Sequence, residues 1–307
     1  MIRTSSLGKR FGALTAVADL TIDVAEGEVV GLLGPNGAGK TTTIRMLAGL
    51  ISASSGEAEV AGCRIGVDND RLRHRVGLLC EVPGLYEHLT AAQNLSIYAR
   101  LYGHPQPGRQ VERYLHLLGL WERRDDLAGT FSKGMKQKLA IARALVHEPR
   151  VLFLDEPTSA LDPKITRVVR QFLADLRAEG RTIVLCTHDL GEAERLCDRI
   201  AVLSGRLVAL DEPAALRRRL FGRATTIRLA GPADGYREAI VALDFVQSVA
   251  ASGGDLSIEL DDPQSRNPIV VRRLVEAGAE IVSVGEREHS LEEVYLQLIG
   301  DEEEARQ

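Results

Sequence analysis

The spacing of apolar residues along the chain predicts strands that alternate with helices. From Ile2 to Val24 apolar and polar residues alternate over short stretches, which is typical of antiparallel strands. Two unbroken apolar runs, Glu28–Leu33 and Val151–Leu154, predict strands that are buried on both faces. Apolar residues at helical spacing follow the first run over Thr41–Leu50. This order predicts an α/β body around a largely parallel sheet.

A second pattern interrupts this body. Residues 85–130 carry apolar positions at helical spacing, and the segment Pro105–Gly108 breaks the run. We therefore expect a small helical subdomain inserted between the strands of the body. The remaining elements expected in the body are strands at Val76–Leu79 and Thr182–Thr187 and one helix at Lys133–His147.

A boundary is predicted near Leu210–Gly222, which divides the chain into domains at residues 1–220 and 221–307. The second domain reads strand, helix, strand, strand, helix, strand, which is a ferredoxin-like α+β order. Its clearest elements are Thr225–Leu229, Gly235–Leu243, Leu256–Leu260, Pro268–Ala277 and Glu280–Val284. A last helix is expected at Leu291–Ile299, followed by the acidic segment Asp301–Glu304 as a frayed, solvated tail.

Composition excludes several classes of protein. No apolar run approaches the roughly 20 residues that span a bilayer, and the start of the chain lacks the pattern of a signal peptide, so we expect an intracellular, soluble chain. A net charge of −5 gives no general attraction to nucleic acid. The cysteines form no CxxC pair and are expected to be reduced: Cys63, Cys80, Cys186 and Cys197.

The segment between the first buried strand and its helix matches GxxxxGK[ST], the pattern of a phosphate-binding loop. Backbone N–H groups of such a loop surround phosphate oxygens, and the helix N-terminus adds partial positive charge. Lys40 would bind the β- and γ-phosphates, and the Thr41 hydroxyl would ligate Mg²⁺. The sequence therefore predicts ATP and Mg²⁺ as cofactors. The expected nucleotide contacts are Gly34, Pro35, Asn36, Gly37, Ala38, Gly39, Lys40, Thr41 and Thr42.

Two carboxylates follow the second buried strand. Asp155 is a candidate to hold Mg²⁺ through water, and Glu156 is a candidate general base for an attacking water. Both would lie where the strands of an open α/β sheet end, which is the usual place for a ligand. Taken alone, the pair is equally typical of a strand that leaves the core through acidic residues, but the neighbouring phosphate-binding loop favours the catalytic interpretation.

Four further segments make the chain resemble the ABC ATPase family over residues 1–220. Phe131–Gln137 resembles the signature loop, in which Ser132 and Gly134 match the family form Leu-Ser-Gly-Gly-Gln. Lys133 and Met135 depart from it in a way that resembles the drug- and sodium-efflux branch. The other three segments are Ser159–Asp162, which is similar to the D-loop, His188, which is similar to the switch histidine, and Phe11, which stands where the family places an aromatic residue against adenine.

The resemblance implies roles for these residues. Ser132 of a second subunit would bind the γ-phosphate, Gly134 would allow close approach, and Asp162 would shape the contact between subunits. His188 would contact the γ-phosphate and sense its loss, and it is counted with Glu156 among the catalytic residues. The alternatives are that Phe11 belongs to the core and that the lysines of the signature helix form only a solvated face.

One position departs from the family pattern. Val76–Glu81 aligns with a segment that usually ends in glutamine, whereas this chain has Glu81. A third carboxylate beside Asp155 and Glu156 raises a pKa, because like charges that share a site disfavour ionisation. We expect Glu81 to couple the nucleotide site to the helical subdomain. The alternative is that it merely lies nearby.

The resemblance also implies partners. Two copies, or this chain and a related subunit, would form a head-to-tail dimer around two ATP molecules, and a separate polytopic membrane permease would hold the dimer at the cytoplasmic face of the cell membrane. Pro83–Tyr86 is the candidate contact with that permease, with ordinary loop packing as the alternative. Export is implied by the efflux-type signature and by the C-terminal domain, for which we favour a role in bracing the dimer.

Two other functions compete with a transporter motor. A soluble ABC ATPase acting on nucleic acid or the ribosome would usually carry coiled coils, zinc insertions or two cassettes, and this chain has none of these patterns. Its acidic balance also argues against a nucleic-acid partner. Another P-loop enzyme, such as a nucleotide kinase, would leave Ser132, Asp162 and His188 without a role.

Overall fold

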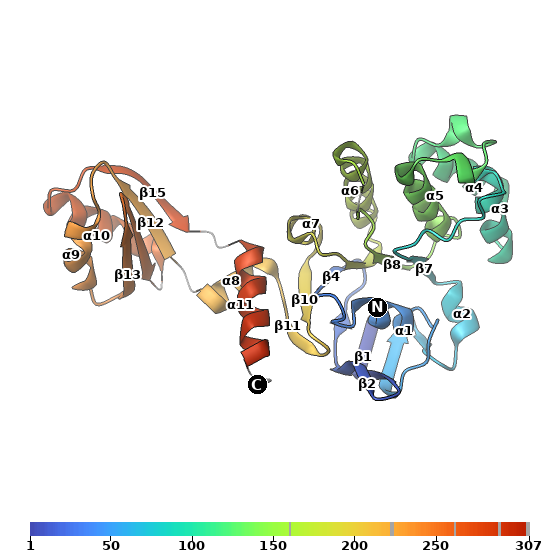
Figure 1. Ribbon diagram of the computed structural model, residues 1–307, viewed down its shortest axis with the longest axis horizontal. Coiled ribbons are helices and arrows are strands. Elements are labelled where there is room, and N and C mark those ends of the chain that lie inside the picture. The colour runs from blue at the N-terminus through green and yellow to red at the C-terminus, as the bar shows by residue number, and fades with distance from the viewer. Residues whose placement is uncertain (160, 222–223, 261, 288–289, 305–307) are drawn as a thin grey trace. The chain divides into compact units, whose positions relative to one another are not determined.

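The computed structural model describes residues 1–307 except 160, 222–223, 261, 288–289 and 305–307. The chain forms two compact units. The first comprises residues 1–211 and 301–307, and the second comprises residues 212–300 (Figure 1). Each unit has its own cluster of buried apolar side chains.

A six-stranded sheet forms the centre of the first unit, with the order β11-β10-β4-β9-β8-β7. Neighbouring strands from β10 to β7 are parallel, and only β11 runs antiparallel at the edge. Every residue of β4, β8 and β9 is buried, as the unbroken apolar runs predict. The strands are β4 (Val29–Leu33), β7 (Val76–Leu79), β8 (Val151–Asp155), β9 (Thr182–Cys186), β10 (Arg199–Leu203) and β11 (Leu207–Asp211).

An antiparallel sheet packs beside the central one. Its strands are β1 (Ile2–Phe11), β2 (Leu14–Leu20), β3 (Asp23–Val24), β5 (Ser55–Val60) and β6 (Cys63–Arg64). Buried residues of both sheets and of helix α1 (Lys40–Leu47) form one apolar cluster, which includes Leu20, Leu47 and Phe153. The helix that follows the glycine-rich loop is therefore held between the two sheets. A short helix α2 (Asn69–Arg73) leads from β6 to β7.

The predicted helical subdomain is present between β7 and β8. Figure 1 shows α3 (Ala91–Leu101), α4 (Pro107–Leu117) and α5 (Lys133–Leu145) gathered together. Helix α3 starts with a capping box, in which Thr90 and Gln93 satisfy each other's backbone N–H groups. Two 3₁₀ turns, η1 (Trp121–Arg123) and η2 (Ala128–Thr130), join α4 to α5.

Helices α6 (Pro163–Ala178) and α7 (Leu190–Leu196) complete the body of the first unit. Helix α7 packs close to β4, because a Cβ atom added at Gly31 would lie 2.9 Å from Cys197 Sγ, at the end of that helix. All four cysteines are free thiols.

The second unit has the ferredoxin-like architecture that the order of elements predicts. Its four-stranded antiparallel sheet has the order β13-β14-β12-β15, and α9 and α10 contribute to its core. Helix α10 begins at Pro263, five residues before the predicted start, and contains Pro268 in its first turns. The elements are α8 (Pro213–Phe221), β12 (Ala224–Leu229), η3 (Asp234–Tyr236), α9 (Arg237–Val241), β13 (Val246–Ser252), β14 (Asp255–Leu260), α10 (Pro263–Glu276), β15 (Ile281–Arg287) and α11 (Leu291–Glu304), whose residues from 301 onward belong to the first unit.

The acidic segment near the C-terminus is not the frayed tail that its composition predicts. Asp301 and Glu302 continue helix α11, and Glu302 is only 7% exposed. Both of its carboxylate oxygens accept hydrogen bonds from the Arg206 guanidinium, at 3.0 and 2.7 Å. The prediction was wrong because a charge run is solvated only when no partner is within reach, and the turn between β10 and β11 supplies one.

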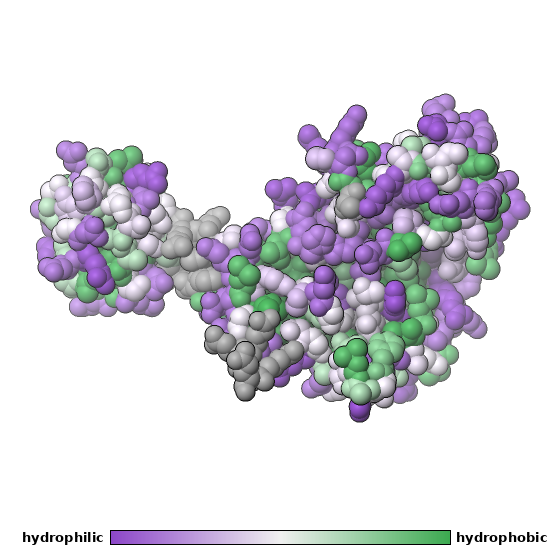
Figure 2. All heavy atoms as spheres, in the orientation of Figure 1, coloured by the Kyte–Doolittle hydropathy of each residue, from purple (hydrophilic) through white to green (hydrophobic). Residues whose placement is uncertain are grey.

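No helix among the described residues is long and apolar enough to cross a membrane. On the face of the first unit visible in Figure 2, hydrophilic and hydrophobic residues are interspersed, and the hydrophobic ones form only small patches.

The packing of β7 against α5 gives a test of the fold. Gly77 touches this helix so closely that an added Cβ atom would lie 2.2 Å from the Ala144 carbonyl oxygen. We expect Gly77→Ala to lower the free energy of unfolding by about 1–3 kcal/mol through overpacking. Gly108→Ala, in the first turn of α4, has open space around it and should change stability by less than about 0.5 kcal/mol. Urea unfolding of both variants checks this, and equal midpoints would contradict the close contact.

Candidate functional site

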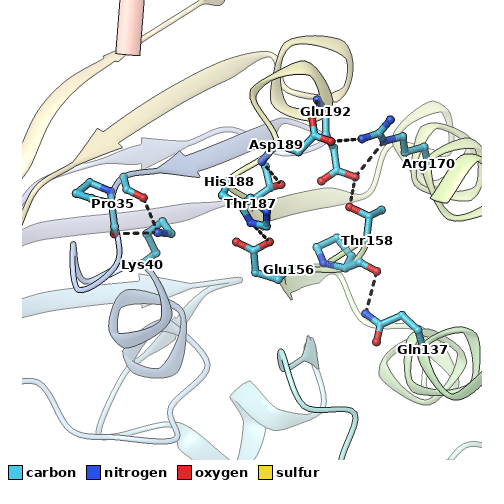
Figure 3. A network of polar contacts seen from close by, with 12 residues as sticks. Pro35, Lys40, Gln137, Glu156, Thr158, Arg170, Thr187, His188, Asp189 and Glu192 are labelled. Carbon is cyan, nitrogen blue, oxygen red and sulfur yellow. Dashed lines mark hydrogen bonds and ion pairs between the residues drawn. The ribbon is translucent and has the colours of Figure 1, made fainter. Parts of the chain in front are cut away.

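The glycine-rich segment forms a loop between β4 and α1. Gly39 lies directly before the helix with φ 95°, and a Cβ atom there would lie 2.5 Å from the Ala16 carbonyl oxygen. A side chain at this position would therefore be both strained and obstructed. The Lys40 ammonium folds back over the loop and donates to the carbonyl oxygens of Gly34, at 2.6 Å, and Pro35, at 3.1 Å (Figure 3).

A cavity of about 630 Å³ opens over this loop. It brings together residues that are far apart in the sequence, from the first strands to the loop after β9. The predicted site residues that line it are Phe11, Asn36, Gly37, Ala38, Gly39, Lys40, Thr41, Thr42, Glu81, Asp155, Glu156 and His188. Gly34 and Pro35 do not line it and enter the loop just before those residues.

Asp155 is the last residue of β8 and is 4% exposed. Burial raises the pKa of its carboxyl group, a hydrogen bond with the Thr41 side chain lowers it, and the nearby charge of Glu81 raises it again. The net direction is upward. Glu81 therefore contributes to the electrostatics of the cavity, and its coupling to the helical subdomain stays a prediction.

Glu156 has an unusual backbone. Its φ of 53° places a residue other than glycine in the left-handed region, at a cost of about 1–3 kcal/mol. Its N–H group donates to the Cys186 carbonyl oxygen at 2.9 Å, so the end of β8 remains joined to β9. The side chain is thereby directed to His188, whose Nδ1 lies 2.7 Å from Glu156 Oε2. A carboxylate beside an imidazole can accept a proton from water and be oriented by the ring.

The residues that follow Glu156 are held from two sides. The side-chain amide of Gln137, on α5, donates to the Pro157 carbonyl oxygen at 2.8 Å. The Thr158 hydroxyl donates to the Glu192 carboxylate, on α7, at 2.9 Å (Figure 3). The turn that carries Glu156 is thus tied to a helix on each side.

The cavity has an apolar end near β1 and β2. The Phe11 side chain is 51% exposed, which excludes the alternative that it belongs to the core, and the Lys9 ammonium lies 5.1 Å from its ring centre. Sequence reasoning missed three neighbours that line the same end: Leu14, Thr15 and Ala16. The one feature of the sequence that could have indicated these neighbours is Leu14, an apolar residue just after the tight turn that follows Phe11. Leu14 is 66% exposed.

Three predicted residues do not line this cavity: Ser132, Gly134 and Asp162. Ser132 caps α5, where its hydroxyl accepts from the Met135 N–H at 3.3 Å, and Asp162 caps α6. A Cβ atom added at Gly134 would lie 3.1 Å from the Ile165 side chain, so this glycine also permits α5 and α6 to approach. Of the D-loop segment, residue 160 lies outside the described residues.

The donor set suits a hard cation that keeps water in its shell. Thr41 and the buried Asp155 supply neighbouring oxygen atoms, and Mg²⁺ is usually held by one or two such groups together with phosphate oxygens. Among the described residues, no group of three or more His, Cys, Asp or Glu side chains could hold a metal ion, so phosphate and water oxygens would have to supply the remaining ligands.

Comparison with known proteins gives consistent results. A family model described as ABC transporter matches residues 17–159. The linearmycin resistance ATP-binding protein of Bacillus subtilis (strain 168) is 34% identical, over 98% of each chain. A fluoroquinolones export ATP-binding protein of Mycobacterium tuberculosis (strain CDC 1551 / Oshkosh) is 35% identical, over 98% of this chain and 93% of its own length.

Solved structures resemble the first unit. The ATP-binding subunit of an ABC transporter aligns with a TM-score of 0.68 and 33% identity, over 72% of this chain and 94% of its own. A dimeric ATP-binding cassette in a post-hydrolysis state with ADP and phosphate aligns with a TM-score of 0.64 and 26% identity, over 69% of this chain and 98% of its own.

The raised pKa of Asp155 predicts how pH affects stability. The folded state binds this proton more tightly than the unfolded chain does, so ionisation of Asp155 lowers the free energy of unfolding as pH rises above the ordinary value of 3.8. We expect Asp155→Asn to melt at a higher temperature than the wild type at pH 7 and to lose this advantage toward pH 4.

Thermal unfolding without nucleotide, from pH 4 to 8, measures the difference. Asp162→Asn is the control, because Asp162 is exposed and asparagine caps a helix equally well. An Asp155→Asn protein that melts below the wild type at pH 7 would contradict the expected cost of this carboxylate.

Proposed function

We propose that this chain, which belongs to the ABC transporter family of ATP-binding proteins, powers export of a substrate through a separate membrane permease. The chain is an ATPase of this family. The observation that carries the export assignment is similarity along the whole chain, C-terminal unit included, to proteins named for antibiotic resistance and drug export. Similarity limited to the first unit would be expected for every branch of the family and would not by itself indicate export.

The cavity supports a mechanism of hydrolysis at one end of the bound nucleotide. Lys40 binds the β- and γ-phosphates, and the exposed ring of Phe11 stacks on the adenine. Thr41 and Asp155 would hold Mg²⁺, which would supply positive charge against the phosphates. These residues orient the γ-phosphate toward Glu156.

Glu156 takes a proton from the attacking water. The water oxygen forms a bond to the γ-phosphorus while the bond from that phosphorus to the bridging oxygen breaks, and ADP leaves with the electron pair. The imidazole of His188, 2.7 Å from the Glu156 carboxylate, fixes the orientation of this base. Such general-base assistance contributes about 10²–10⁴-fold to a rate.

A second subunit completes the site in this proposal. Ser132, Gly134 and Asp162 do not line the cavity of their own chain. In a head-to-tail dimer, the Ser132 hydroxyl and the N-terminus of α5 face the γ-phosphate of the partner, where the helix dipole favours a negative charge. Loss of the γ-phosphate then removes the contact that holds the dimer closed.

The loop Val82–Tyr86 supports binding of a permease through exposed apolar side chains. Val82 is 75% exposed and Tyr86 51%. Its backbone is nevertheless well held, because the buried side chain of Asn94 bonds Tyr86 N and O at 2.9 and 3.0 Å. Arg143 also donates to the Gly84 carbonyl oxygen at 2.6 Å. The segment Pro83–Tyr86 therefore presents side chains from a fixed loop, which suits contact with the cytoplasmic part of a permease.

Glu156→Gln tests the proposal as a whole. We expect hydrolysis to fall by about 10²–10⁴-fold while ATP binding persists, so that the ATP-bound dimer accumulates. The protein is then purified from native membranes in mild detergent with ATP, and its companions are identified. Lys40→Ala, which removes the phosphate-binding charge, is the control, and no companion protein should be purified with it.

A polytopic membrane protein in stoichiometric amount with Glu156→Gln, and absent with Lys40→Ala, would support the exporter. Ribosomal proteins or nucleic acid in its place would overturn the transport assignment and leave the ATP-driven dimer intact.

Glu81→Gln should retain ATPase activity, with kcat within about threefold of the wild type. Glutamine keeps an oxygen that can contact Mg²⁺ or water, and it removes one charge that raises the pKa of Asp155. Glu87→Gln is the matched control, because Glu87 pairs with Lys136 at 2.6 Å and does not line the cavity. A folded Glu81→Gln protein that binds ATP and does not hydrolyse it would refute this expectation.

A further inference from the structure

Glu192 is a buried carboxylate that the proposed chemistry does not use. It lies in the first turn of α7 with 0% exposure, and it does not line the nucleotide cavity. A buried carboxylate is costly unless its oxygen atoms are paired. Its surroundings therefore indicate what it does.

The partners of Glu192 come from different elements. Oε1 accepts from the Thr158 hydroxyl at 2.9 Å and lies 3.4 Å from Arg170 Nε, on α6. Oε2 has no hydrogen-bond partner in the part of the chain that the structure describes. Burial raises the pKa of Glu192, while the side chains of Thr187, Thr158 and Arg170 act in the opposite direction and the charge of Asp189 adds to the increase.

These contacts reach the two loops that carry the proposed catalytic pair, because Thr158 bonds Glu192 from the Glu156 loop and Arg170 joins Glu192 to Asp189 in the His188 loop. Thr158 stands two residues after Glu156, and Thr187 directly precedes His188. The Thr187 hydroxyl in turn accepts from the Asp189 N–H at 3.0 Å. Figure 3 shows this network beside the Glu156–His188 pair, with Arg170 bonded to both Asp189 and Glu192.

The loop after β8 needs such support. The left-handed backbone of Glu156 is strained, and the proline that follows narrows its conformations further. Strain of this kind persists only where the surroundings fix the chain on both sides. Gln137 fixes Pro157 from α5, and Glu192 fixes Thr158 from α7.

We propose that Glu192 is a positioning residue for ATP hydrolysis, which holds the Glu156 loop and the His188 loop in register through Thr158 and through Arg170, which also bonds Asp189. The inference rests on the proposed roles of Glu156 and His188. Glu192 touches neither nucleotide nor water in this proposal and acts only through the geometry of the two loops.

The competing explanation is that Glu192 only stabilises the fold. Buried charged groups can often be replaced by apolar residues of similar volume without loss of stability. Glu192→Met preserves volume and removes both acceptors, so it separates the two explanations. We expect it to melt within a few degrees of the wild type, to keep KM for ATP within about threefold, and to lose at least tenfold in kcat. Glu192→Gln keeps an acceptor for Thr158 and should restore most of the activity.

Thr158→Val provides a second route to the same contact. It removes the hydroxyl and preserves the shape of the side chain. Its loss of kcat should not add to that of Glu192→Met in the double variant, because both single changes break one interaction. Steady-state hydrolysis by the full chain with ATP and Mg²⁺ measures all three proteins. This route keeps the proposal testable if Glu192→Met folds poorly.

Glu28→Met is the matched control. Glu28 is also a largely buried carboxylate, paired with Arg199, and it does not line the cavity. It should lose stability without losing kcat. A wild-type kcat in Glu192→Met or Thr158→Val, or additive losses in the double variant, would overturn the positioning role.

Glu156→Gln, assayed in parallel, separates this failure from failure of the proposed function. If Glu156→Gln hydrolyses ATP normally, the catalytic assignment itself is wrong. If Glu156→Gln is inactive while Glu192→Met is fully active, only the role of Glu192 is excluded.

Discussion

The left-handed backbone of Glu156 is the constraint on which the site depends. Strand β8 is buried along its whole length and must leave the sheet between neighbouring strands, so its last residues have little freedom. A positive φ turns the chain at once and directs the carboxylate to His188. The conformation costs free energy, and the hydrogen bonds of Gln137 and Thr158 offset that cost. The buried core, the end of β8 and the helices α5 and α7 together therefore fix the direction of the Glu156 carboxylate.

Electrostatics in the cavity follow from the same arrangement. Three carboxylates and the Lys40 ammonium line one space, and burial with the charge of Glu81 raises the pKa of Asp155. An anionic polyphosphate alone would be repelled by such a group of acids. A polyphosphate with a divalent cation would be attracted in the proposed mechanism, because the cation would meet Asp155 while the loop N–H groups and Lys40 would meet the phosphate oxygens.

The sequence predicts the parts of the site that depend on local geometry. The loop Gly34–Thr41 and the pair Asp155 and Glu156 are recognisable because a buried strand, a turn and a helix are continuous in the chain. Contacts between distant segments leave no such pattern. Thr158 and Glu192 are 34 residues apart, and nothing between them indicates that they meet. The acidic C-terminal segment was misjudged for the same reason, since Glu302 meets Arg206 across 96 residues.

Helix α5 connects two regions of the proposed site, namely the segment that begins at Ser132 and the turn that carries Glu156. Thirteen residues give it a length of about 20 Å. It begins directly after its capping residue Ser132. Just over one turn later, the Gln137 side chain donates a hydrogen bond to the carbonyl oxygen of Pro157, the residue after Glu156. Tilting the helix by about 5° about its C-terminal end, which is about 12 Å from Gln137 along the axis, moves Gln137 by about 1 Å. That displacement is enough to break a hydrogen bond. A small rotation of the helical subdomain can therefore release the turn that carries Glu156, the proposed general base.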